Sequence, residues 1–111
     1  MKLMVLILHP VEKLEPVLEK LERAGVRGAT VLSSRGMAMA LENYTDGSFL
    51  GSLRAVLDPD REENRTILAV LPDDHVQKAV DAIEAVVGSL NNPNTGVVFT
   101  VPVDFAKGIQ S

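Results

Sequence analysis

Apolar and polar positions follow two kinds of pattern along the chain, and the same succession of patterns occurs twice. An apolar run over Lys2–Leu8 precedes an amphipathic helical pattern over residues 11–24, and a second apolar run over Asn64–Leu71 precedes another helical pattern. Each half then reaches a glycine and a further apolar run, over residues 28–35 and 97–101. This order predicts a duplicated strand-helix-strand unit.

Proline and acidic residues indicate where the two helices begin. Pro16 is tolerated only in the first turn of a helix, so we expect the regular first helix to begin near Leu14 or Glu15. In the second half, Asp73 or Asp74 is expected to cap the helix, because short acidic side chains accept hydrogen bonds from the free amides of a first turn.

The six elements predict an α+β, ferredoxin-like βαββαβ fold, in which an antiparallel sheet carries both helices on one face. We expect residues 1–111 to form a single domain. The strands are apolar on both faces, unlike those of a sheet with one face in water. Because each large apolar side chain left in water forgoes roughly 1.5–3 kcal/mol, we expect further copies of the chain to cover the second face and predict an obligate oligomer.

Composition excludes several classes of function. The chain has no cysteine, so it has no disulfide, thiolate metal site or cysteine nucleophile, which suits a cytoplasmic location. A net charge of -4 and only four Phe and Tyr residues argue against nucleic-acid binding. The first apolar run stops at His9, too early for a membrane span, so no membrane insertion is expected.

A long excursion over residues 36–63 separates the second and third strands. It is far longer than an ordinary hairpin loop of about two to five residues, and insertions of this length are usually functional or disordered. Its pattern predicts a short helix over residues 49–57. This helix either shields an edge of the sheet or takes part in binding.

No motif in the chain indicates an enzyme, since both a glycine-rich phosphate fingerprint and a nucleophile elbow are missing. His9 and His75 occupy equivalent ends of the two repeats, near Asp73 and Asp74. If these strand ends met at one edge of the sheet, the four side chains could form a metal or general-base site. Capping carboxylates beside solvent-facing histidines explain the same pattern without a ligand.

The turn over residues 91–96 is rich in asparagine and ends in glycine. Its backbone amides and asparagine side chains could wrap an anion or a polar small molecule, and a plain connection explains the turn nearly as well. Arg35 and Lys107 are the nearest cations in the sequence to the long excursion and to this turn. Either cation could complete such a pocket at a subunit boundary.

Short motifs in both halves resemble the PII nitrogen-regulatory family and together cover nearly the whole chain. The first half has an apolar strand that ends in His9-Pro10, followed by the sequence AGVRGATV and by Arg35-Gly36. The second half has the sequence VLPDDHV and, after the turn, GVVF.

The resemblance implies a trimer whose sheets pack about a central axis, with adenine nucleotides and often 2-oxoglutarate in clefts between subunits. By this resemblance, residues 36–63 correspond to the T-loop, which meets a target protein. Residues 91–96 correspond to the phosphate-binding B-loop, and residues 101–108 correspond to the C-terminal loop. By the same resemblance, Thr30, Gly36 and Gly96 match family positions near the nucleotide. With the turn and the two cations, the candidate effector-binding residues are Thr30, Arg35, Gly36, Asn91, Asn92, Thr95, Gly96 and Lys107.

The chain departs from the family pattern at its charged positions. Val97 replaces the B-loop lysine, Phe105 and its neighbours replace an arginine pair, and Met39 and Ala40 replace a glutamine and an arginine. Each lost charge-assisted contact to phosphate costs on the order of 1.5–3 kcal/mol, so we expect weak ATP binding.

The sequence thus predicts a PII-like signal-transduction or enzyme-regulatory protein in nitrogen or carbon metabolism. It would sense a small effector, with an adenine nucleotide as one candidate, and pass the signal to a target protein through residues 36–63. No cofactor is assigned. The alternative is a trimeric module that binds a divalent metal.

Overall fold

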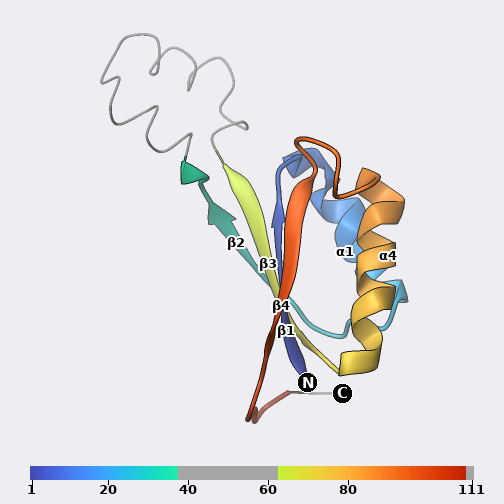
Figure 1. Cartoon of the computed structure of the whole chain (residues 1–111), viewed down its shortest axis with the longest axis vertical. Helices are drawn as coiled ribbons and strands as arrows, with labels where there is room; N and C mark the ends of the chain where they lie inside the picture. Colours follow the sequence, from blue (N-terminus) through green and yellow to red (C-terminus); the bar gives the residue numbers. More distant parts are fainter. Residues whose placement is uncertain (38–62, 110–111) are drawn as a thin grey trace, which may run out of the picture.

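The computed structural model describes residues 1–37 and 63–109 (Figure 1). The short helix expected over residues 49–57 lies outside this part of the chain. Within it, the elements follow the expected order of strand, helix, strand, strand, helix, strand. The fold is the α+β, ferredoxin-like fold that the sequence predicts.

Four strands form one sheet in the described residues. β1 (Lys2–Leu8) lies between β3 (Asn64–Leu71) and β4 (Gly96–Pro102), and β2 (Thr30–Ser34) lies on the outer side of β3. Every neighbouring pair is antiparallel. β2 and β4 are therefore the two edge strands.

Both helices begin in the same way, with a proline in extended backbone followed by one turn of 3₁₀ helix. η1 (Val11–Lys13) leads into α1 (Leu14–Arg23), and η3 (Asp73–His75) leads into α4 (Val76–Val87). Pro16 falls in the first turn of α1, where its missing N–H removes no helical hydrogen bond. The predicted start of this helix is therefore confirmed.

The predicted side-chain cap of the second helix is wrong. The residues at the cap positions are Pro72 and His75, and neither makes a side-chain cap hydrogen bond. Asp73 instead accepts a hydrogen bond from the amino group of Met1 at 2.6 Å. This contact joins the start of β1 to the turn in front of α4.

One face of the sheet packs against both helices and forms the hydrophobic core (Figure 1). Alternate side chains of a strand point to opposite faces, so every second residue of β1 and β3 contributes to this core. Both helices add buried residues from their inner sides. The core includes Met4, Leu6, Leu8, Val17, Leu21, Ile67, Ala69, Leu71, Ala79 and Ile83.

The opposite face carries no helix in the described part of the chain and is also mainly apolar (Figure 1). We call it the open face. The strand register assigns to it Leu3, Val5, Ile7, Thr30, Leu32, Thr66, Leu68, Val70, Val97, Phe99 and Val101. On the edge strands its large apolar side chains are 43–51% exposed. The expectation that the sheet is apolar on both faces is therefore confirmed.

Candidate functional site

The ends of all four strands meet on one side of the sheet, which we call the loop end. β1 and β2 finish there, and β3 and β4 begin there. The excursion over residues 36–63 leaves and re-enters the sheet at this end (Figure 1). Six of the predicted effector-binding residues also lie here: Arg35, Gly36, Asn91, Asn92, Thr95 and Gly96.

These six residues form two groups at opposite edges of the sheet. Arg35 and Gly36 follow β2, whereas the turn over residues 91–96 leads into β4, and β3 and β1 lie between them. Three strand spacings of about 4.8 Å each separate the two groups. A single protomer therefore does not gather them into one pocket.

The other two predicted residues lie away from the loop end. Thr30 is opposite Leu68 on the open face. Lys107 is exposed in the segment that follows β4, at the other end of the sheet. Nearby, Gly108 and Ile109 line a hollow of about 1140 Å³ that the sequence did not predict. Within one protomer, Lys107 and the turn over residues 91–96 are thus at opposite ends of the sheet.

A polar row crosses the sheet at the loop end, one step beyond the apolar residues of the open face. It consists of Ser34, Asn64, His9 and Thr95, and the register pairs Ser34 with Asn64. Nδ1 of His9 lies 3.0 Å from Oδ1 of Asn64, and the backbone N–H of His9 donates to the carbonyl oxygen of Thr95 at 3.3 Å. Asn64 is only 9% exposed, so its amide depends on partners within the protein.

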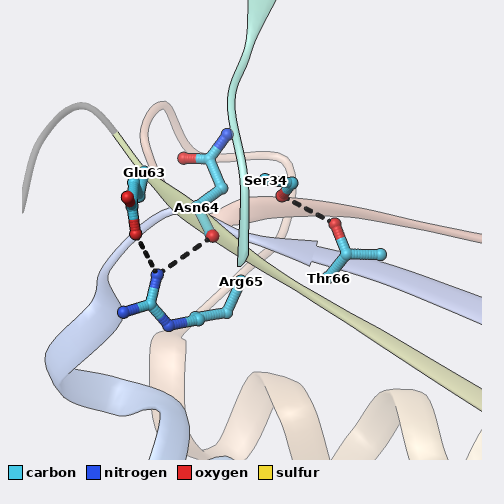
Figure 2. Close-up of polar contacts among 5 residues, drawn as sticks. All are labelled: Ser34, Glu63, Asn64, Arg65 and Thr66. Atoms are coloured by element: carbon cyan, nitrogen blue, oxygen red, sulfur yellow. Dashed lines mark hydrogen bonds and ion pairs between the residues drawn. The ribbon is translucent and has the colours of Figure 1, made fainter. Parts of the chain in front are cut away.

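One further contact joins β2 to β3 at the loop end, and two more lie within the start of β3 and the residue before it (Figure 2). The hydroxyl oxygens of Ser34 and Thr66 are 2.8 Å apart. The guanidinium of Arg65 donates to the carboxylate of Glu63 at 3.2 Å and to the backbone carbonyl of Asn64 at 3.3 Å. Figure 2 shows the side chain of Asn64 pointing away from this guanidinium, so the two side chains lie on different faces of the sheet.

The turn in front of β4 satisfies several of its own amides. The amide of Leu90 donates to Oε2 of Glu84 at 2.8 Å, and the amides of Asn91 and Asn92 donate to the hydroxyl and the carbonyl of Ser89 at 3.2 Å and 3.0 Å. The amides of Asn91 and Asn92 are thus engaged by Ser89, and the amide just before them is engaged by a carboxylate of α4. The turn offers an anion fewer donors than the sequence alone suggested, together with a negative charge nearby.

Gly96 has a structural role of its own at the start of β4. Its φ is 152°, a conformation that L-residues with a side chain rarely adopt. A Cβ atom at this position would lie 2.6 Å from the carbonyl oxygen of Ile7. Glycine is therefore required here by the close approach of β4 to β1.

His9 and His75 lie at opposite ends of the sheet. His9 follows β1 at the loop end, whereas His75 follows β3, and these two strands run antiparallel. Within residues 1–37 and 63–109, no group of three His, Cys, Asp or Glu side chains could hold a metal ion. Within one protomer, the possibility that these histidines meet Asp73 and Asp74 in one metal or general-base site is therefore excluded for the described residues.

The ion pair between Asp73 and the amino group of Met1 is at the end of the sheet opposite the loop end. The hydrogen bond from this ammonium group lowers the pKa of Asp73, slight desolvation opposes the change, and the charges of the ammonium and of Lys2 add to the lowering. Both partners are largely exposed, at 45% and 66% of their side-chain surface. The contact is therefore a weak tie between the strand layer and the helix layer.

The fold, the long excursion and the two groups of residues at the loop end define a ferredoxin-like domain with most of its candidate binding residues at or beside the loops. The family model of the nitrogen regulatory protein P-II matches residues 1–111, and the chain belongs to this family. The resemblance seen in the short motifs is therefore confirmed, and membership supports a signalling or regulatory role. No curated protein matches the chain. None of the helices in the described residues is long and apolar enough to cross a membrane.

Proposed function

We propose that the protein is a PII-like regulator that acts as a homotrimer. It senses a small effector in clefts between copies, signals to a target protein through residues 36–63, and catalyses no reaction itself. The observation that carries the proposal is the open face, a largely apolar surface with the candidate binding groups at its loop end. Family membership supports the regulatory role.

The open face gives the physical reason for an assembly. Leu32, Val97 and Phe99 are 46–51% exposed on it, and covering each large apolar side chain gains up to roughly 1.5–3 kcal/mol. A second copy of the chain is a suitable cover, because it presents a matching apolar surface and cyclic homo-oligomers are common. The number of three copies comes from the family resemblance.

A cyclic assembly also explains why the candidate site is divided between two edges. In a ring, every interface joins two different sides of the protomer. The β2 side of one copy then meets the β4 side of the next. This arrangement brings Arg35 and Gly36 of one copy close to residues 91–96 or 101–108 of its neighbour and completes the cleft.

The effector in this cleft carries less negative charge than ATP. The carboxylate of Glu84 is bound to the turn, and Val97 stands where the family resemblance places a lysine. Charge-assisted hydrogen bonds to phosphate are worth on the order of 1.5–3 kcal/mol each, so their loss penalises a triphosphate most. We expect AMP, 2-oxoglutarate or bicarbonate to bind in preference to ATP.

Sedimentation and calorimetry test the proposal together. At micromolar concentration the protein should sediment as a trimer, and titration with ATP, ADP, AMP, 2-oxoglutarate and bicarbonate should give heat with at least one of them. Arg35→Ala should weaken that binding at least tenfold. Arg23→Ala is the matched control, at the exposed end of α1 on the helix side, and should leave the binding unchanged. A monomer, or a trimer that gives no heat with any of these compounds, would contradict the proposal.

A further inference from the structure

We propose that His9 is a positioning residue that couples the turn in front of β4 to the place where the 36–63 excursion joins β2 and β3. The two groups of candidate binding residues lie at opposite edges of the sheet, and His9 contacts structure on both sides. The biological use of this coupling rests on the proposed function. The test of the coupling needs no effector, so the coupling and the proposed function can fail separately.

The two contacts of His9 use different parts of the residue. Its backbone N–H reaches the carbonyl of Thr95 at 3.3 Å, on the side of β4. Its imidazole reaches the side chain of Asn64 at 3.0 Å, on the side of β3. A displacement of Thr95 therefore moves the backbone from which the imidazole extends.

Each end of this path is anchored in the protein. Thr95 is 9% exposed, and its hydroxyl donates to the carbonyl of Asn92 at 2.8 Å, which links it to the tip of the turn. Asn64 is also 9% exposed, and its Nδ2 lies 3.7 Å from the position that a Cβ atom of Gly36 would occupy. The two ends of the path are thus buried, whereas His9, which joins them, is exposed and is held by its two hydrogen bonds. Contiguous hydrogen-bonded contacts of this kind can carry coupling between sites.

The tautomer of His9 follows from which atom of the Asn64 amide faces the ring. The atom of Asn64 that faces the ring is Oδ1, which can only accept a hydrogen bond. Nδ1 must therefore carry the proton, and in the neutral ring Nε2 is left as the acceptor. The ¹⁵N chemical shifts of the ring report this state directly.

The first test follows the described ends of the excursion by NMR. Thr95→Val removes the hydroxyl contact within the turn and keeps the branched shape of the side chain. In the otherwise unchanged protein it should shift the resonances of the Gly36 backbone amide and the Asn64 side-chain amide. In a His9→Phe background both shifts should disappear. His9→Asn keeps a side-chain N–H at the position of Nδ1, so it should restore them.

The matched control is Thr66→Val, which removes a hydroxyl contact between β2 and β3 outside this path. In that background the response to Thr95→Val should persist. A response that survives in His9→Phe, or that is lost equally in Thr66→Val, would overturn the proposal.

A double-mutant cycle gives an independent measurement. His9→Phe and Asn64→Leu should each destabilise the fold, and their effects on the unfolding equilibrium should deviate from additivity by roughly fivefold, as expected for one hydrogen bond. Additive effects would show that the two side chains do not act on each other.

Discussion

The two faces of the sheet are built from the same kinds of residue and differ in what covers them. Leu6 on the helix side is 0% exposed, whereas Phe99, on the neighbouring strand and on the open face, is 46% exposed. An apolar pattern in a strand therefore indicates burial in the final assembly and not only in the protomer. Substitutions that act on one face and not the other can test this interpretation.

Substitution on the helix side should have the largest effect on stability. Leu6→Ala removes a buried side chain from the core between β1 and the helices, so the free energy of unfolding should fall by about 2–5 kcal/mol. Urea denaturation followed by circular dichroism measures this change. Leu6→Met nearly conserves volume and should cost less than about 1.5 kcal/mol. Equal losses for the two variants would show that this position is not tightly packed.

Substitution on the open face should act mainly on assembly. Phe99→Asp places a charge on a surface that we propose lies between copies, and an unpaired buried charge is strongly unfavourable. The dissociation constant of the oligomer should rise at least tenfold, which corresponds to about 1.4 kcal/mol. Sedimentation velocity over a range of concentrations measures this change.

Lys78→Asp is the control for the open-face substitution, because it also introduces an aspartate but on the exposed outer surface of α4. It should leave the sedimentation behaviour unchanged. If Phe99→Asp also sediments like the parent protein, the open face is not the surface that joins the copies.

The fold could be predicted from the sequence because its signals are local. Continuous apolar runs predicted the strands, helical spacing predicted the helices, and the position of Pro16 predicted the start of α1. The contact between His9 and Asn64 could not be predicted in this way, since these residues are 55 positions apart and polar residues at strand ends usually face water. The sequence did hold one signal for Asn64, because it is a polar residue at the start of an otherwise apolar strand.

The separation of the two histidines has a topological cause. Sequence repetition makes His9 and His75 equivalent within their own units, and each follows the first strand of its unit. The two strands are neighbours in the sheet and run antiparallel, so their ends point in opposite directions. Equivalence in a repeat does not imply proximity unless the repeated strands are parallel. Lys107 lies far from the turn over residues 91–96 within one protomer because the turn precedes β4 and Lys107 follows it.

The smallest effect is expected at the ion pair between the amino group of Met1 and Asp73, which joins the sheet to the helix layer at the end opposite the loop end. The hydrogen bond from the ammonium lowers the pKa of Asp73 from its ordinary value of 3.8. The stability from this pair is therefore present above about pH 4 and is lost as the pH falls through the lowered pKa. Asp73→Asn should lower the urea midpoint slightly at pH 6, and the difference from the parent protein should vanish near pH 2. Asp74→Asn changes a residue outside the ion pair and should not reproduce this pH dependence. If the difference in urea midpoint between Asp73→Asn and the parent protein stays constant with pH, the carboxylate charge is not the source of the stability.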